Sequence, residues 1–446
     1  MNKGISARAG GIAITIYASQ ATKFASGPGQ AKYEHLNINF DGGVPTDAKG
    51  IFAELAGVQE MSEATTSLLK QPKAMPKAIA LSQAGRCICS TFDYNSSLGS
   101  VAVVAGSGQP GHGDGDGSTA EFNEPKGLEI SPDGTYLYVA EYINQRIRSI
   151  VLATGTVSTI AGSGIAGFTD AIGASAAFNN PAGLGLYPDG KTLLVGDVFN
   201  HAVRSIDLST NTVTTLAGGT KGYADGSLDT ARFTSPADVV VSPDAAKVYV
   251  ADGGNNRIRV IDLVARTVST LAGSGVAAFA DAAGAAASFA FPFGLDLTQD
   301  GATLVVADFQ NNRIRSVDTG SGVVSTLAGS GPTKGWECTY PPIADPDPNC
   351  GTFADGAGDA AAFAWPASGT LTPDQKYFIV ADYFNQRVRA VSLATREVTT
   401  LAFIDGSDTS AGYAGPADVV SSPDGGTLYV SQRNGQRIAA ITVPKR

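Results

Sequence analysis

The stretch "FNEPKGLEISPDGTYLYVAEYINQRIRSI", residues 122–150, decides the fold, because closely related strings return five times further along the chain. A proline marks each copy, and successive prolines are 56, 55, 56, 74 and 50 residues apart: Pro125, Pro181, Pro236, Pro292, Pro366 and Pro416. Sixteen residues after each proline stands an acidic residue or, in the last copy, a glutamine: Glu141, Asp197, Asp252, Asp308, Asp382 and Gln432. Such constant spacing identifies an internal structural repeat.

Each repeat reads as four short strands joined by tight turns. In the second repeat, apolar and β-branched residues alternate in four segments, residues 183–187, 192–197, 202–207 and 213–217, and a Pro-Asp-Gly turn separates the first two. This pattern is typical of an antiparallel meander. A single meander cannot bury both of its faces, so the repeats are expected to pack radially as the four-stranded antiparallel blades of an all-β propeller.

The repeats resemble the NHL-repeat β-propeller family. The shared features are P-x-G-[LI] in the first strand, S-P-D-G in the turn, [LY]-V-A-[DE] and N-x-R-[IV]-R, and they cover about residues 122–443. Five repeats match this pattern well. The sixth departs from it at Gln432, Gly435 and Ala439. The linkers between repeats end on an aromatic residue that is expected to pack between blades: Phe178, Phe233, Phe289 or Phe363.

The number of blades depends on how the ring closes. The final repeat ends after its third strand and needs a fourth from elsewhere. Residues 51–57, "IFAELAG", resemble a closing strand and favour seven blades, one of them a shortened unit that begins at Pro76. Six blades, the usual number in the resembled family, would instead require residues 101–106, "VAVVAG", in that role. We therefore assign residues 1–50 to an N-terminal extension and residues 51–446 to the propeller, with an insertion loop at about residues 331–352.

The composition argues against nucleic-acid binding and against a membrane-spanning helix. The 446 residues include 31 Lys+Arg against 41 Asp+Glu, for a net charge of −10. Proteins that bind nucleic acid usually carry a basic domain, so nucleic acid is not an expected partner. No run approaches the roughly 18 consecutive apolar residues of a spanning helix, and no membrane span is predicted.

The recurrent arginines are interpreted as structural. In three repeats an arginine follows the acidic residue by five positions, which predicts the pairs Asp252 with Arg257, Asp308 with Arg313, and Asp382 with Arg387. A guanidinium at this spacing can meet a carboxylate or a turn carbonyl of its own or the next blade. The resemblance implies RNA binding as a remote alternative. NHL propellers that bind RNA use a basic face, whereas this chain has a net charge of −10.

The histidine count excludes the zinc chemistry of NHL-like lyases. The resemblance implies several histidines around zinc in such enzymes, whereas this chain has only His35, His112 and His201. His201 occupies a loop position where Gln or Asn stands in the other repeats. A lone loop histidine is most often solvated, and no metal ligand or catalytic residue is predicted.

An acidic set on the first strands is the main alternative site. Asp238 and Asp418 stand two residues after their prolines, and Glu129 and Asp296 stand four residues after theirs. First strands line the channel of a propeller, where such oxygens hold calcium in propeller lactonases and related hydrolases. A calcium-dependent hydrolase is therefore the alternative function. Such enzymes also need a basic residue at the channel mouth, and none is recognisable in the sequence.

The insertion loop carries a predicted disulfide and a predicted contact. Cys338 and Cys350 bracket a Pro- and Asp-rich segment that no other repeat has, and a bridge between them would close it. This disulfide predicts an oxidising compartment outside the cytosol. Trp336 and Tyr340 stand beside Cys338, and exposed aromatic residues on a loop are favoured contacts for a partner protein.

The sequence favours a non-enzymatic interaction scaffold without a cofactor. The expected partners are other proteins, bound through the propeller loops as part of a larger assembly. Because a fold alone does not specify function, this prediction rests on the resemblance and on the lack of a recognisable catalytic set.

Overall fold

The computed structural model describes residues 4–9, 12–19, 35–41, 94, 101–331, 353–404 and 414–444. These residues belong to two units, residues 1–91 and 92–446. In the first unit, three strands form an antiparallel sheet in the order β1 (Gly4–Ala9), β2 (Ile12–Ser19), β3 (His35–Asp41). This sheet lies in the N-terminal extension, for which the sequence predicts no definite structure.

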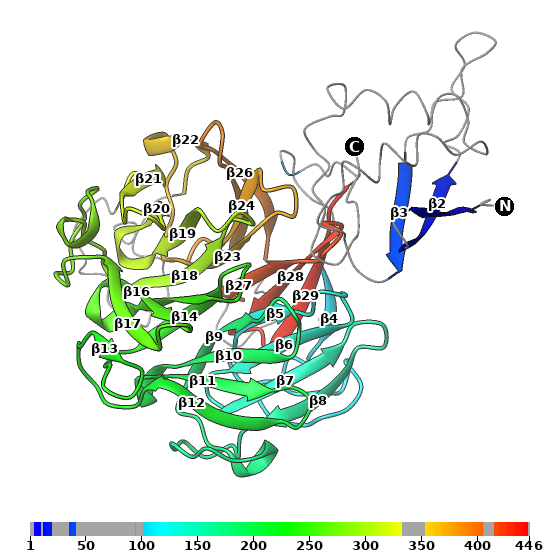
Figure 1. Cartoon of the computed structure of the whole chain (residues 1–446), viewed down its shortest axis with the longest axis horizontal. Helices are drawn as coiled ribbons and strands as arrows, with labels where there is room; N and C mark the ends of the chain where they lie inside the picture. Colours follow the sequence, from blue (N-terminus) through cyan, green and yellow to red (C-terminus); the bar gives the residue numbers. More distant parts are fainter. Residues whose placement is uncertain are drawn as a thin grey trace, which may run out of the picture. The chain divides into compact units, whose positions relative to one another are not determined.

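The second unit is a β-propeller with six blades in its described residues (Figure 1). The first strands of neighbouring blades contact one another around a common centre. Blade 1 consists of β5 (Pro125–Ile130), β6 (Tyr136–Glu141), β7 (Arg146–Val151) and β8 (Thr156–Ala161). Blade 2 consists of β9 (Pro181–Leu186), β10 (Thr192–Asp197), β11 (Ala202–Asp207) and β12 (Thr212–Gly218). Blade 3 consists of β14 (Pro236–Val241), β15 (Lys247–Asp252), β16 (Arg257–Asp262) and β17 (Thr267–Ala272), with β13 (Gly226–Ser227) at its outer edge.

The remaining blades follow the same antiparallel order. Blade 4 consists of β18 (Pro292–Leu297), β19 (Thr303–Asp308), β20 (Arg313–Asp318) and β21 (Val324–Ala328). Blade 5 consists of β23 (Pro366–Leu371), β24 (Tyr377–Asp382), β25 (Arg387–Ser392) and β26 (Glu397–Phe403), with β22 (Gly356–Ala357) at its outer edge. Blade 6 consists of β27 (Pro416–Ser421), β28 (Thr427–Gln432), β29 (Arg437–Thr442) and β4 (Val101–Ala105).

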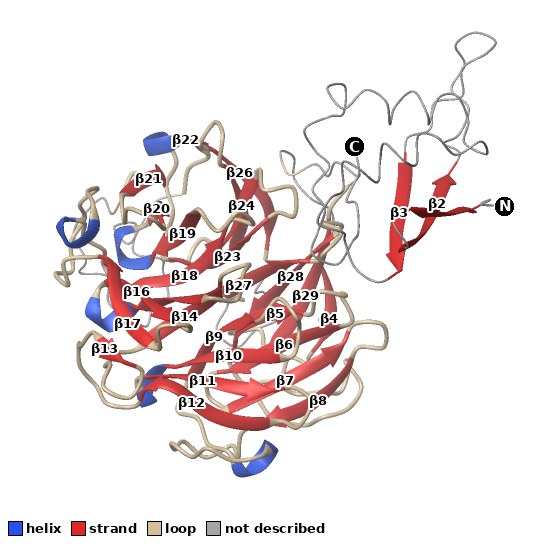
Figure 2. Ribbon diagram, in the orientation of Figure 1, coloured by secondary structure: helices blue, strands red, loops and turns tan. Residues whose placement is uncertain are grey.

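The helices of the described residues are single 3-10 turns in the connections (Figure 2). They are η1 (Gly173–Ser175), η2 (Val198–Asn200), η3 (Gly253–Asn255), η4 (Gly284–Ala286), η5 (Phe309–Asn311) and η6 (Gly358–Ala360). Within the ranges that the structure describes, no helix has the length and apolar character needed to cross a membrane.

The ring closes through β4, which pairs with β29 of the last blade. Ala105 lies opposite Ile438 in this register, and Val101 lies opposite Ile441. The free edge of the last repeat is therefore taken by residues 101–105. The favoured prediction of seven blades, closed by residues 51–57, is wrong, and the alternative of six blades is confirmed. Residues 51–57 themselves lie outside the described residues.

The core lies between neighbouring blades. The predicted linker aromatics are completely or almost completely buried there: Phe178, Phe233, Phe289 and Phe363. Phe178, for example, packs among Tyr138 and Ile147 of blade 1 and Leu184 and Leu193 of blade 2. Each such ring contributes roughly 1.5–3 kcal/mol by its removal from water. The linkers thus fix one blade against the next.

Candidate functional site

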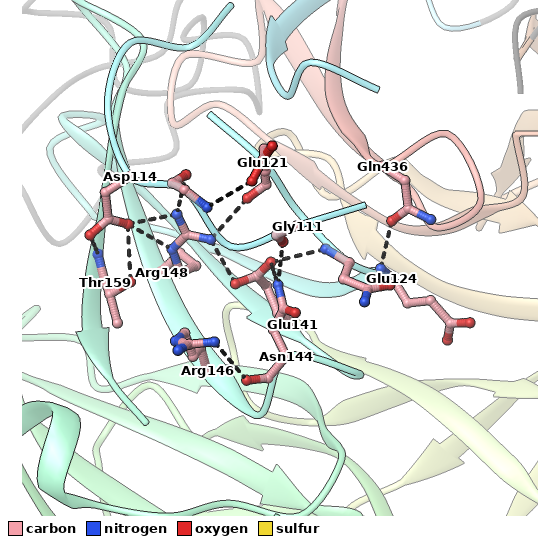
Figure 3. A network of polar contacts seen from close by, with 12 residues as sticks. Gly111, Asp114, Glu121, Glu124, Glu141, Asn144, Arg146, Arg148, Thr159 and Gln436 are labelled. Carbon is pink, nitrogen blue, oxygen red and sulfur yellow. Dashed lines mark hydrogen bonds and ion pairs between the residues drawn. The ribbon is translucent and has the colours of Figure 1, made fainter. Parts of the chain in front are cut away.

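A buried arginine closes the same polar network in each of the first five blades. In blade 1 the Nη1 atom of Arg148 donates to Glu141 at 2.7 Å, and its Nη2 atom donates to Asp114 of the preceding linker at 2.6 Å (Figure 3). The equivalent arginines, Arg204, Arg259, Arg315 and Arg389, have matching carboxylate partners at 2.5–2.8 Å, and all five side chains are completely buried. Each network ties a linker to the blade that follows it.

The predicted pairing used the wrong arginine of each repeat. The Asp252 carboxylate pairs with Arg259, seven residues on, whereas Arg257 donates to the backbone carbonyls of Asn255 and Ser274. The Arg257 guanidinium also lies 3.8 Å from the centre of the Tyr223 ring. The predicted partners of Asp308 and Asp382, which were Arg313 and Arg387, are replaced by Arg315 and Arg389 in the same way. Both arginines of the repeat act as structural ties: the predicted alternative of a carbonyl partner holds for Arg257, and the carboxylate partner belongs to Arg259.

His201 is part of a second tie, which runs from blade to blade. Its Nδ1 atom accepts a hydrogen bond from the backbone N–H of Ser235 at 3.1 Å. At the other junctions a side-chain amide oxygen accepts the corresponding bond from a backbone N–H group, and these oxygens belong to Gln145, Asn256, Asn312, Gln386 and Gln436. Burial, with a contribution from Lys221, lowers the pKa of His201, which favours the neutral ring that this bond requires. The histidine replaces a structural amide.

The acidic set forms a third tie, around the channel. Asp238 accepts the backbone N–H of Val239 in its own strand and that of Leu295 in the next blade, at 2.9 and 2.8 Å. Asp418 makes the equivalent bonds to Val419 and Leu128. Asp296 likewise bonds Leu297 and Leu371, and Glu129 bonds Ile130 and Leu186. Each carboxylate therefore joins two neighbouring first strands.

These four carboxylates line one small cavity of about 90 Å³, as the sequence predicts for a channel set. Asp238 and Asp418 come from blades 3 and 6, which are opposite in a ring of six. Burial raises the pKa of Asp238 well above its usual range, and the charge of Asp418 adds to this. Burial and the nearby Asp296 carboxylate raise the pKa of Glu129 to about 8, and burial raises that of Asp418 to about 7. The channel therefore favours protonated carboxyl groups.

A larger cavity of about 340 Å³ lies beside this set and is lined mainly by aromatic side chains. We call it the cup and define it by Lys126, Phe291, Phe293, Phe309, Trp365 and Arg433. The aromatic rings form a continuous wall, with ring centres 5.5 Å apart for Phe293 and Phe309 and 4.9 Å apart for Phe309 and Trp365. A concave, mostly apolar surface with few polar groups is the usual form of a ligand site.

Two of these aromatic residues have an unfavourable backbone conformation. Phe291 and Trp365 directly precede the repeat prolines and have φ values of 50° and 52°. A positive φ is a clear outlier for a bulky side chain and costs about 1 kcal/mol or more. At the same position the other blades carry Glu124, Asn180, Ser235 and Gly415. The large rings are therefore not required by the repeat itself.

The cup and its basic residue were not predicted from the sequence. Lys126 lies in the cup at the mouth of the channel, where no basic residue was located from the sequence. The available signal was a departure from the repeat. The residue after the first-strand proline is alanine in four blades and Phe293 in another, but lysine in blade 1.

Comparison with known proteins assigns the family. No protein-family model matches the chain. The chain is 30% identical over 295 residues to the protein SUPPRESSOR OF QUENCHING 1, chloroplastic, of Arabidopsis thaliana, which covers 64% of this chain and 26% of that protein. It is also 29% identical over 163 residues to NHL repeat-containing protein 2 of Homo sapiens, which covers 34% of this chain and 22% of that protein. The chain is an NHL-repeat β-propeller.

This NHL-repeat propeller spans about a quarter of the length of the curated relatives that it matches. Solved structures share the fold alone. An auxiliary nutrient binding protein from Bacteroides thetaiotaomicron has a TM-score of 0.56 at 14% identity, with 77% of this chain and 76% of that chain covered. A protein from Bacteroides ovatus with the same description has a TM-score of 0.55 at 13% identity, with 79% and 78% covered.

The predicted partner loop of this NHL-repeat propeller lies outside the described residues. Trp336, Tyr340 and the proposed Cys338–Cys350 bridge all fall between residues 331 and 353, and Cys87 and Cys89 also lie outside them. The disulfide and the loop contact therefore stay predictions. Within the described residues, the cup is the site that the geometry favours.

Proposed function

We propose that this NHL-repeat propeller is a non-enzymatic interaction scaffold that binds a segment of a partner protein in the cup. The observation that carries the proposal is the placement of Phe291 and Trp365. Both rings line the cavity from positions at which a large side chain is strained. Large aromatic side chains in a pocket are favoured anchors for a binding partner. A binding role accounts for rings that the blade geometry disfavours.

The bonding of the polar groups supports a role without catalysis. The buried arginines are committed to carboxylates, and the Nδ1 atom of His201 is committed to a backbone N–H. The carboxylates of the acidic set already accept backbone N–H groups from two blades each. Groups used in this way hold the scaffold together, and they favour neither calcium ligation nor a basic face for RNA.

The experiment compares Trp365→Ala and Phe309→Ala with a matched aromatic change outside the cup. Phe279→Ala is the control, because this ring is 43% exposed on a linker and stacks on Arg313. The protein is purified from native material after cross-linking, and the proteins attached to it are identified by mass spectrometry. We expect the same partner with the wild type and the control, and its loss with both cup variants. A partner retained by both cup variants would contradict the proposal.

Turnover tests the non-enzymatic part separately. Wild-type protein and Asp238→Asn are assayed with calcium against a panel of lactones and esters. We expect no hydrolysis by either protein. Calcium-dependent turnover by the wild type that is lost in Asp238→Asn would replace the scaffold proposal with the hydrolase alternative.

A further inference from the structure

Lys126 is a buried cation within an aromatic cavity. The residue is only 9% exposed, and its Nζ atom lies 4.2 Å from the centre of the Tyr142 ring and 4.3 Å from that of Phe293. The described residues supply this atom with ring contacts but with neither a hydrogen-bond acceptor nor an ion-pair partner. The atom is not completely buried, so water or a ligand in the cup can provide the acceptor that the chain does not. The cup therefore contains an anchoring point that the chain itself does not fill.

The charged groups around Lys126 leave it available for an anion. Arg433, the other cation of the cup, donates to Glu124 at 2.9 Å through its Nε atom. Asp238 is the carboxylate of the acidic set whose charge raises the pKa of Lys126, and it accepts hydrogen bonds from two backbone N–H groups. Burial, with a contribution from the Arg433 charge, lowers the pKa of Lys126 well below its usual range, although Glu124, Asp238 and the two ring faces favour its charged form. An anion that enters the cup would shift this balance toward the ammonium.

The shape of the cup limits what the anion is attached to. The walls of the cup also include the rings of Phe291, Phe309 and Trp365, which suit an aromatic or branched apolar group. A volume of about 340 Å³ is at the small end of the usual range for ligand pockets, roughly 300–1,000 Å³. The anion and the apolar group must therefore be close together on the same ligand. A C-terminal residue meets this condition, because its carboxylate and its side chain share one Cα atom.

We propose that the cup binds a carboxylate carried on an aromatic or branched apolar group, with Lys126 as its anchor, and that the partner supplies it as its C-terminal residue. The assignment of this carboxylate to a partner protein rests on the proposed function. The binding chemistry itself rests only on the cavity, on the buried amine and on the aromatic wall. A charge-assisted bond in a desolvated pocket is among the stronger polar contacts.

The chain offers its own optical reporter for a test. It has two tryptophans, Trp336 and Trp365, so Trp336→Phe leaves the cup residue as the only source of tryptophan fluorescence. The full chain with this change is titrated with an N-acetylated tripeptide that ends in phenylalanine, either as the free acid or as the C-terminal amide. 3-Phenylpropionate is the third ligand. The variants Lys126→Ala and Lys126→Met are measured in the same background.

Alanine is a safe replacement, because it occupies the equivalent position in four other blades as Ala182, Ala237, Ala367 and Ala417. We expect the free acid to bind at least about tenfold more tightly than the amide, as one charge-assisted bond predicts. Both Lys126 variants should reduce the affinity for the acid to that for the amide. An amide that binds as tightly as the acid, or a variant that binds the acid unchanged, would overturn the proposal.

The third ligand distinguishes a peptide C-terminus from a small carboxylic acid as the source of the bound carboxylate. If 3-phenylpropionate binds through Lys126 and the tripeptide acid does not, the carboxylate site stands but its assignment to a C-terminus is overturned. If the tripeptide acid binds and the native partner is unaffected by Trp365→Ala, the carboxylate site stands and the proposed function fails. The two proposals can therefore be contradicted independently.

Discussion

Asp252 and Arg257 lie opposite each other in the register of β15 and β16, yet the Asp252 carboxylate pairs with Arg259 at 2.7 Å. Both partners of this ion pair are completely buried. Burial raises the pKa of Asp252 to about 6, although the Asn255 amide, the Thr234 N–H and the arginine all favour its charged form. The pair is therefore maintained against a large desolvation cost, and neither partner can be left alone.

Removal of one partner should consequently be costly. We expect Arg259→Ala to lower the free energy of unfolding by about 3–5 kcal/mol, the range for an uncompensated buried charge. Arg257→Ala removes a partly exposed ring contact and two carbonyl bonds, and should cost about 1 kcal/mol. Urea unfolding followed by circular dichroism measures both. Equal costs for the two variants would contradict the assignment.

Blade 6 supplies the matched double variant. It carries Gln432 and Ala439 where the other blades have the acid and the second arginine, so both charges are replaced together. We therefore expect Asp252→Gln combined with Arg259→Ala to be more stable than Arg259→Ala alone.

Ring closure can be tested by truncation. A chain that begins at Phe92 keeps β4 and should unfold cooperatively. A chain that begins at Gly106 lacks β4, leaves β29 with an unpaired edge, and should be unfolded or aggregated, because that edge exposes its backbone groups. Circular dichroism and gel filtration distinguish these outcomes. A cooperative fold without residues 1–105 would contradict closure by β4.

The acidic set predicts an unusual dependence of stability on pH. The pKa of Glu129 is raised from about 4.5 to about 8, so the folded protein holds this proton more tightly than the unfolded chain. Its contribution to stability is fully present below pH 4.5 and is lost as the pH rises through 8. Glu129→Gln cannot lose this proton. The stability of the variant relative to the wild type should therefore rise by about 4 kcal/mol between pH 5 and pH 9. A difference that is independent of pH would refute the raised pKa.

The insertion loop predicts a disulfide in the native protein. Mass mapping of alkylated, non-reduced protein should find Cys338 and Cys350 in one linked peptide pair. Cysteine residues 87 and 89 should react with the alkylating reagent under denaturing conditions. The oxidising compartment that we expect depends on this bridge, and two free thiols in protein from native material would refute both.

Deletion of residues 336–350 should weaken partner binding without loss of the propeller.

The fold could be predicted because short, local sequence features define each repeat. The prolines, the Pro-Asp-Gly turns and the alternation of apolar residues define blades without reference to distant contacts. The strand that closes the ring was harder to predict from the sequence. Residues 51–57 and 101–106 both read as closing strands, and only the pairing of β29 with β4 distinguishes them. That choice depends on packing between segments far apart in the sequence.

The site was harder to predict than the fold because no short motif encodes it. Lys126, Phe309, Trp365 and Arg433 come from four blades and meet only when the ring has formed. Each occupies a repeat position at which other blades carry small or different residues. Comparison of the repeats with one another, column by column, would have selected them, whereas a search for catalytic motifs could not.

The pairing of β4 with β29 also has a consequence for synthesis. Arg437 donates to the carbonyl of Ser107 across 330 residues of sequence. During translation, β4 emerges before all other strands of the ring and has no partner until the last blade is made. Such a distant contact closes slowly, and both edges remain open meanwhile. At high concentration the β4 strand of one molecule can therefore dock on the last blade of another, and exchange of this strand is the characteristic error expected of the protein.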